Sequence, residues 1–219
     1  MEENFWQERW ALNEIGFHQK DINEALQTFW PRLAVAKGAT VFVPLCGKSR
    51  DMVWLRDQGH RVIGVELSAL AVEAFFSENG WIPEVRREDP FTVYAAAGIQ
   101  IYCGNFFELP ASLLREVTAV FDRASLIALP PAMRRDYAAH LVNILPAGCD
   151  MLLVTLAYPP EQKEGPPFSV DALEVTALFG GGYQVQHLRE QDILAREPRF
   201  RDAGMTRLEE QVFRLTRRD

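Results

Sequence analysis

Hydrophobic residues recur with two different periods along residues 40–157. Short runs rich in valine, isoleucine and leucine alternate with longer stretches whose apolar residues return every three or four positions. The first pattern is typical of buried strands and the second of helices. The predicted strands are 40–44, 61–66, 99–103, 117–122 and 150–157, and the predicted helices between them are 49–58, 68–79 and 131–145. This alternation predicts an α/β fold, a mostly parallel sheet with helices on both faces.

Serines and glycines mark the ends of two of these helices. Ser49 and Ser68 stand at expected N-cap positions, where a hydroxyl accepts a hydrogen bond from a free backbone amide. Gly59 and Gly80 follow the same helices, where a left-handed residue ends the last turn. The boundaries of these two helices are therefore predicted from the capping serines and glycines as well as from the hydrophobic period.

The two ends of the chain follow a different pattern. Helix-like stretches cover residues 4–13 and 21–30. The segment YPPEQKEGPPF, at 158–168, holds four prolines and predicts a surface loop. A short helix near 169–178 precedes two strand-like runs, 183–190 and 207–216, which predict a closing hairpin with an antiparallel last strand. No linker or repeat divides the chain, so we expect residues 1–219 to form one domain.

Charge and composition exclude several classes of function. The net charge of −7 provides no basic field for nucleic acid. No apolar run approaches the roughly 20 residues of a membrane span, and the first residues lack the pattern of a secretory signal. Three widely spaced cysteines suit reduced thiols, and four scattered histidines lack metal-ligand spacing. We expect a cytoplasmic protein without metal, nucleic acid or membrane partners, and a monomer because no heptads are present.

The turn VFVPLCGKSRD, at 41–51, is a candidate ligand site between a strand and a helix. Its GKS resembles the end of a phosphate loop, but Phe42 occupies the position of that loop's first glycine. A dinucleotide turn needs three glycines, and only Gly47 is present. A nucleoside without phosphates needs less backbone for binding anions. The sparse glycines therefore favour such a ligand.

Glu66 ends the second predicted strand, 19 residues after Gly47. This spacing is close to the one that places a carboxylate on ribose hydroxyls. Dehydrogenases use the same acid, and Glu66 is also suited to the start of the next helix. The glycine count separates the two nucleoside classes and favours S-adenosylmethionine over NAD.

Five segments together carry a family resemblance. They are FWQERWALNEIGFH, VPLCGKSRDMVWL, GHRVIGVELS, VFDRASLIALPP and YPPEQKEGPPFSV, in this order along the chain. The sequence resembles the bacterial thiopurine S-methyltransferases. The resemblance implies the Rossmann-like seven-stranded methyltransferase sheet with an antiparallel last strand, and an N-terminal helical lid within residues 1–32. It also implies S-adenosyl-L-methionine as methyl donor and aromatic or heterocyclic thiols, such as thiopurines, as small-molecule acceptors.

The resemblance and the strand ends together give the candidate site residues. The cofactor-binding candidates are Trp10, Leu45, Gly47, Glu66, Asn105, Phe106 and Arg123, and the substrate-binding candidates are Phe17, Arg123 and Arg199. Asn105 and Phe106 follow the third predicted strand, where an amide and a ring are expected to bracket adenine. Other interpretations remain open: core packing for Phe106, an ion pair with Asp122 or another acid for Arg123, and a solvated charge for Arg199.

No residue pattern indicates a catalytic base or nucleophile. The donor already carries an activated methyl group, and a thiopurine sulfur ionises near neutral pH, so orientation and a dry pocket are the main requirements. We therefore expect no catalytic side chain. Three alternatives share parts of this pattern: a methyltransferase acting on selenium or tellurium oxyanions, with which bacterial members are associated, a nucleoside-binding sensor without turnover, and an NAD-dependent dehydrogenase.

Overall fold

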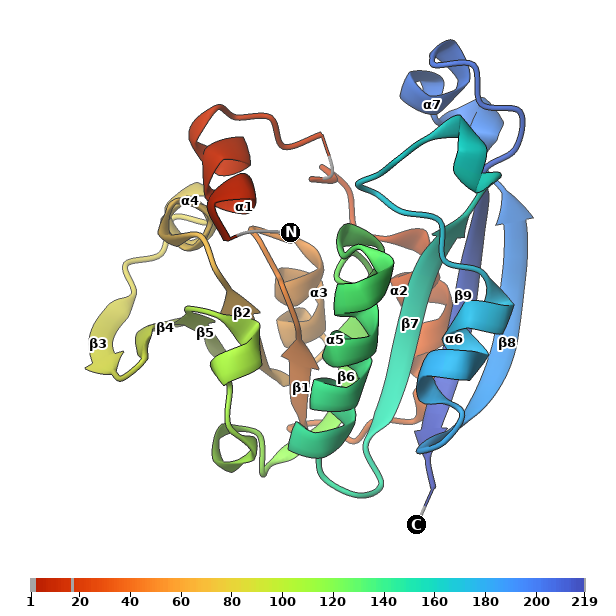
Figure 1. The fold of residues 1–219 in the computed structure, drawn as a ribbon. Coiled ribbons are helices and arrows are strands. Elements are labelled where there is room, and N and C mark those ends of the chain that lie inside the picture. Colours follow the sequence, from red (N-terminus) through yellow and green to blue (C-terminus); the bar gives the residue numbers. More distant parts are fainter. Residues whose placement is uncertain (1–2, 17, 219) are drawn as a thin grey trace.

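A computed structural model describes residues 3–16 and 18–218 (Figure 1). The strands within this part of the chain form one sheet in the order β3-β4-β5-β2-β1-β6-β7-β9-β8. Their bounds are β1 Thr40–Val43, β2 Arg61–Glu66, β3 Glu84–Glu88, β4 Phe91–Ala96, β5 Ile99–Cys103, β6 Val117–Asp122, β7 Asp150–Ala157, β8 Tyr183–Asp192 and β9 Glu209–Arg217. All five strands predicted in the first part of the chain are present.

The centre of the sheet is parallel and its two sides are antiparallel. Strands β5, β2, β1, β6 and β7 pair in parallel. Strand β9 pairs antiparallel with both β7 and β8. The predicted α/β class and the antiparallel last strand are therefore confirmed.

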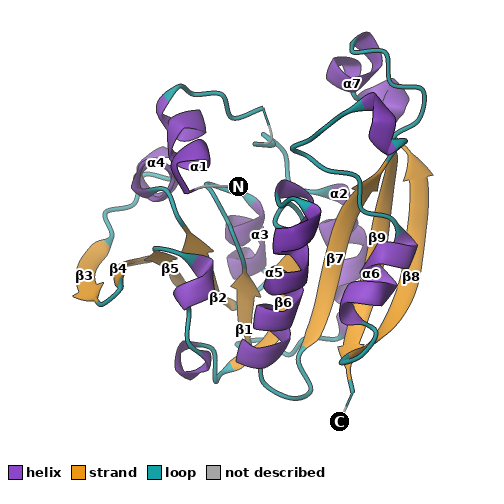
Figure 2. Cartoon of the chain, in the orientation of Figure 1, coloured by secondary structure: helices purple, strands orange, loops and turns teal. Residues whose placement is uncertain are grey.

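Helices cover both faces of the sheet (Figures 1 and 2). Their bounds are α1 Glu3–Ala11, α2 Glu24–Phe29, α3 Asp51–Asp57, α4 Ala69–Glu78, α5 Pro131–Ile144, α6 Ala172–Phe179 and α7 Pro198–Asp202. One buried cluster joins α5 and α6 to the sheet, and a second joins α2, α3 and α4 to its opposite face. The two apolar layers fix the strand ends on which the site is built.

Three of the four predicted helix-capping residues are correct, and one is wrong. Ser68 caps α4, and Gly59 and Gly80 follow their helices with φ of +93° and +70°. Helix α3 begins at Asp51, and its N-cap is Arg50 rather than Ser49. Ser49 Oγ instead accepts a hydrogen bond from the Asp51 amide and donates one to the Asp51 carboxylate.

The sheet has nine strands rather than the seven that the family resemblance implies. The two additional strands form the β3–β4 hairpin at the edge beyond β5. Strand β3 reads EVRRE and exposes most of its side chains, so its sequence lacks the apolar run of a buried strand. Charged residues on an edge strand oppose pairing with another chain. Because β3 is mostly charged, a search for hydrophobic periods does not predict it.

Three segments gather at the carboxyl ends of the parallel strands (Figure 1). Helix α1 lies there, as does the insertion between β8 and β9 that carries α7 and the 3-10 helix Leu194–Arg196. The proline-rich loop contains a second 3-10 helix, Pro160–Gln162. None of the described helices is long and apolar enough to cross a membrane.

Candidate functional site

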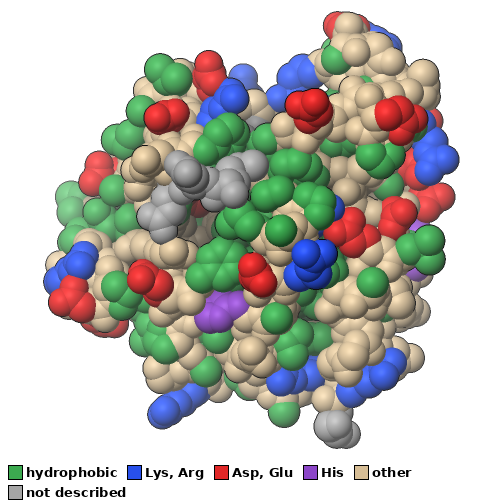
Figure 3. Space-filling model, in the orientation of Figure 1, with side chains coloured by type: hydrophobic (Ala, Val, Ile, Leu, Met, Phe, Trp, Pro, Cys, Tyr) green, Lys and Arg blue, Asp and Glu red, His purple; other side chains and the backbone are tan. Residues whose placement is uncertain are grey.

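A cavity of about 1190 Å³ opens at the carboxyl ends of the parallel strands. Its walls come from α1 and the segment after it, the ends of β1, β2, β6 and β7, the proline-rich loop, and the α7 insertion. Hydrophobic side chains gather on this side of the molecule between α1 and α5 (Figures 1 and 3). A typical small-molecule pocket holds roughly 300–1,000 Å³, so the cavity has room for two ligands side by side.

Leu45 and Gly47 shape the turn after β1. Leu45 has φ of 41° and Gly47 has φ of 52°, and both residues line the cavity. A left-handed leucine is costly, because its Cβ crowds the backbone. The turn therefore holds a strained residue beside the ligand space.

Glu66 joins this turn to the start of α4. Its Oε2 accepts a hydrogen bond from the Gly47 amide at 2.8 Å, and its Oε1 accepts one from the Ser68 amide at 2.8 Å. The carboxylate is buried, and burial raises its pKa, although the backbone hydrogen bonds act in the opposite direction. Glu66 lines the cavity and places a carboxylate beside the turn after β1.

The Trp10 ring lies against Gly47. A Cβ atom built on Gly47 would come within 3.2 Å of Trp10 Cζ2. The ring thus brings α1 over the turn and leaves no space there for a side chain. This contact supports the expectation that the N-terminal helix covers the strand ends.

Asn105 and Phe106 follow β5, as predicted. The Asn105 side chain accepts a hydrogen bond from the Phe107 amide at 2.9 Å and caps the 3-10 helix Phe106–Glu108. The Phe106 ring is buried, with ring centroids 4.8 Å from Tyr137 and 5.0 Å from His140. Phe106 also lines the cavity, so core packing and a place in the cavity wall occur together.

Arg123 lies at the end of β6 and lines the same cavity. It forms an ion pair with Asp51, with Nε 3.3 Å from Oδ2. The neighbouring Asp122 carboxylate is engaged elsewhere, because it accepts hydrogen bonds from Tyr137 Oη at 2.7 Å and the Ser125 amide at 3.1 Å. An ion pair with a nearby acid was one of the two interpretations of Arg123, and the structure shows that it coexists with exposure to the cavity.

The opposite wall contains Arg199, from α7. Its guanidinium donates a hydrogen bond to the Gly16 carbonyl, which links the α7 insertion to the segment after α1. Arg199 lines the cavity, while 60% of its side chain is exposed and it also forms an ion pair with Glu197. Phe17, the remaining substrate-binding candidate, lies outside the described residues. Gly165, Pro166 and Pro167 of the proline-rich loop form part of the wall.

Several cavity residues had no sequence signal as site residues. Val154 and Leu156 belong to a mostly apolar strand, and Phe200 and Leu208 belong to a small buried cluster within the α7 insertion. Their apolar side chains predict core positions. Only the fold shows that they also line the cavity. Asp51 does not line the cavity and was not selected as a site residue, although it lies within the family segment VPLCGKSRDMVWL.

The titratable groups of the wall do not indicate a nucleophile. Cys46 lines the cavity, and burial raises the pKa of its thiol well above the ordinary value. Burial lowers the pKa of His18, with the charge of Lys48 adding to the effect. No group of three or more metal-ligating side chains occurs among the described residues. The wall is suited to binding and orienting ligands rather than to attack by a side chain.

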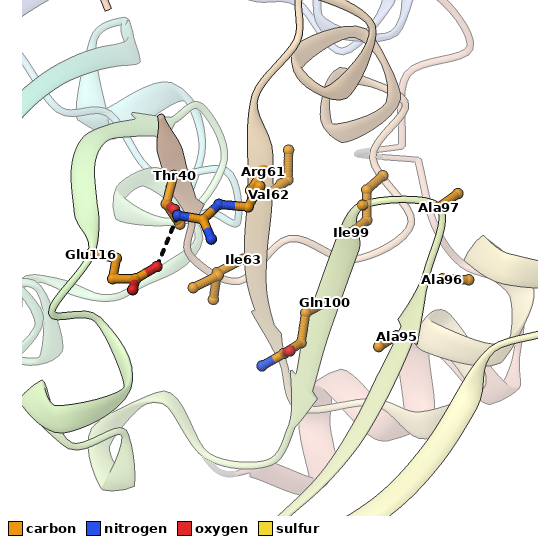
Figure 4. A pocket seen from close by; sticks show the side chains of 11 residues that line it. Thr40, Arg61, Val62, Ile63, Ala95, Ala96, Ala97, Ile99, Gln100 and Glu116 are labelled. Carbon is orange, nitrogen blue, oxygen red and sulfur yellow. Dashed lines mark hydrogen bonds and ion pairs between the residues drawn. The ribbon is translucent and has the colours of Figure 1, made fainter. Parts of the chain in front are cut away.

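A second, shallower groove of about 410 Å³ lies at the opposite edge of the sheet (Figure 4). An ion pair between Arg61 and Glu116, 2.8 Å apart, borders it, and alanines of the β4–β5 hairpin form its far side. None of the candidate site residues lines this groove. In open α/β sheets ligands bind beyond the carboxyl ends of the strands, so the larger cavity is the candidate site.

Comparison with solved structures defines the fold family. A SAM-dependent methyltransferase from Anabaena variabilis superposes with a TM-score of 0.69 at 15% identity, covering 99% of this chain and 95% of that chain. The 1,6-didemethyltoxoflavin-N1-methyltransferase of Burkholderia thailandensis gives a TM-score of 0.66 at 14% identity, covering 99% of this chain and 87% of that chain. The fold is that of the SAM-dependent methyltransferases.

Sequence comparison gives the family. The family model for thiopurine S-methyltransferase matches residues 1–218. Thiopurine S-methyltransferases from Nitrosospira multiformis and Pseudomonas fluorescens are 50% and 51% identical over 218 residues, covering 100% of this chain and 99% and 100% of the relatives. The chain belongs to the thiopurine S-methyltransferase family.

Proposed function

We propose that this chain transfers a methyl group from S-adenosylmethionine to the sulfur of aromatic or heterocyclic thiols such as thiopurines. Family membership over residues 1–218 supports both the donor and the acceptor class. The observation that carries the proposal is the buried Glu66 carboxylate, which lies beside a turn with a single glycine in a cavity large enough for two ligands. A phosphate-bearing ligand would need more free backbone amides at this turn.

The donor half of the site is proposed to comprise Trp10, Leu45, Gly47, Glu66, Asn105, Phe106 and Arg123. Glu66 accepts hydrogen bonds from the ribose hydroxyls, because each carboxylate oxygen retains a second lone pair beside its backbone bond. Trp10 offers a ring face, which attracts a cation. These groups fit an adenosine with a positively charged sulfur, and the bound donor supplies the activated methyl group.

The acceptor half is proposed to comprise Arg123, Arg199 and Phe17. The two guanidinium groups favour the anionic form of a thiol, and a thiopurine sulfur ionises near neutral pH, so a thiolate is available for transfer. Apolar residues of β7 and the proline-rich loop keep water away from the sulfur. The chain therefore acts by binding, alignment and exclusion of water, without a side chain that forms a covalent bond.

Incubation of the pure protein with methyl-labelled S-adenosylmethionine and 6-mercaptopurine tests this proposal. Label should appear in the S-methylated product, and S-adenosylhomocysteine should inhibit its formation. Hypoxanthine, which has oxygen in place of the sulfur, is the matched acceptor control and should receive none. Tight donor binding without transfer to any thiol would contradict the proposal and support a nucleoside-binding sensor.

We further propose that the protein is a monomer. Both edge strands of the sheet support this, because β3 reads EVRRE and β8 reads YQVQHLREQD. Charged and polar edge strands disfavour pairing between sheets of two molecules. Light scattering across a range of protein concentrations should give a constant mass near 24.9 kDa.

A further inference from the structure

The Asp51 carboxylate connects three segments that meet beside the cavity. Its Oδ1 accepts a hydrogen bond from the Asn23 amide at 2.9 Å. Its Oδ2 accepts one from Ser49 Oγ at 3.0 Å and lies 3.3 Å from Arg123 Nε. The Asp51 side chain is only 3% exposed, and Asp51 does not line the cavity, whereas its three partners do.

This arrangement engages one edge of the Arg123 guanidinium. Its contact with Asp51 uses Nε, and no other hydrogen bond or ion pair of Arg123 occurs among the described residues. The two terminal nitrogens therefore remain for a ligand in the cavity. A guanidinium offers parallel donors that suit a carboxylate or another planar anion, provided that its orientation is fixed.

The charge of Asp51 matters as well as its geometry. An unpaired guanidinium near the reaction centre would repel the sulfonium of the donor while attracting a thiolate acceptor. A buried carboxylate 3.3 Å away offsets much of that positive charge. Asp122 forms no ion pair with Arg123 among the described residues, and its oxygens accept hydrogen bonds from Tyr137 and Ser125 instead.

We propose that Asp51 is a positioning residue for methyl transfer. It holds Arg123 by its Nε edge and presents the two terminal nitrogens to the anionic group of a bound ligand. The proposal rests on the proposed function, because it assigns Arg123 to that reaction. The other two hydrogen bonds of Asp51 connect the arginine to Ser49, in the turn after β1, and to Asn23, at the start of α2.

A double-mutant cycle tests this coupling. The variants are Asp51→Asn, Arg123→Lys and the double variant, and Asp171→Asn, at the N-cap of α6, is the matched control outside the cavity. Two dissociation constants are measured by calorimetry: that of S-adenosylhomocysteine, and that of 6-mercaptopurine in the presence of S-adenosylhomocysteine. Neither measurement requires turnover, so failure of the proposed activity does not decide this result. Melting temperatures are recorded for all variants.

We expect Asp51→Asn to weaken the same binding step as Arg123→Lys, each by about tenfold, with little further loss in the double variant. The Asp171→Asn control should leave both dissociation constants unchanged. Multiplicative losses in the double variant would overturn the proposal, since they indicate independent roles. Unaltered binding in either single variant would also overturn it, as would a loss for Asp51→Asn that the Asp171→Asn control reproduces.

Discussion

The Glu66 carboxylate and the Gly47 amide are joined by a hydrogen bond of 2.8 Å that connects the end of β2 to the turn after β1. The acid that is proposed to bind ribose therefore also holds the turn on which the donor would rest. A second bond, from the Ser68 amide, fixes the other carboxylate oxygen. Binding and local architecture depend on one side chain.

Replacing Glu66 with alanine should weaken binding of S-adenosylhomocysteine by roughly 1.5–3 kcal/mol, because charge-assisted hydrogen bonds are lost. Calorimetric titration measures this affinity, and circular dichroism should show a retained fold. Glu116→Ala, at the exposed ion pair of the second groove, is the control and should bind normally. Equal affinities for the two variants would exclude Glu66 from the donor site.

Gly47→Ala should reduce both stability and donor affinity. Its φ of 52° disfavours alanine, and the added Cβ would press on the Trp10 ring at 3.2 Å. Gly38→Ala is the matched control, because its φ is also left-handed, at +80°, yet nothing lies within 4 Å of the added atom. Both variants should lose about 1 kcal/mol of unfolding free energy in urea, and only Gly47→Ala should also lose donor affinity. Normal donor binding by Gly47→Ala would show that Trp10 need not rest on the turn.

Arg199→Ala should release the segment after α1 from the α7 insertion, because it removes the bond to the Gly16 carbonyl. We expect a severalfold higher KM for 6-mercaptopurine and faster chymotryptic cleavage near the N-terminus. Arg201→Ala is the control, since Arg201 belongs to the same helix but does not line the cavity. If both variants behave like the wild type, Arg199 is a surface charge.

Stability should fall in alkaline solution, because cysteine thiols that stay protonated in the folded protein ionise in the unfolded chain. Burial raises the pKa of Cys103 to about 11 and that of Cys149 to about 12, from 9.0. A group whose pKa is higher in the folded state contributes stability below its unfolded pKa, and this contribution is lost as the pH rises through the folded value.

The urea midpoint should therefore decrease between about pH 9 and pH 11, the interval set by Cys103. A Cys103→Ala, Cys149→Ala double variant should show a shallower decrease over the same interval. A decrease of the same size in both proteins would assign the effect to other groups. Below pH 8 the two proteins should respond to pH alike, because both thiols are protonated in the folded and unfolded states.

The local elements could be predicted because their causes lie within short stretches of sequence. Apolar residues that alternate with polar ones at a fixed period identify β2, α4 and α5, and Gly59 and Gly80 end helices through their own conformational freedom. The β3–β4 hairpin could not be found in this way. Its strands lie at the edge of the sheet, where polar side chains remain in water and leave no buried stripe.

The sequence predicted only those site residues that strand ends or the family resemblance indicate. Both indicate Glu66 and Asn105, because the carboxyl ends of parallel strands meet at one edge of the sheet. The bond from Arg199 to Gly16 depends on where two loops come to lie. No local sequence pattern predicts that these two loops meet.

The sequence by itself determined the fold class and predicted Gly47 and Glu66 as donor-site residues, since periodicity and motif are properties of neighbouring residues. Only the tertiary structure decided which charges meet. Asp51 forms an ion pair with Arg123, whereas Asp122 accepts hydrogen bonds from Tyr137 and Ser125. The physical reason is that buried carboxylates must find donors nearby in space, and the packing of the sheet against its helices selects those donors.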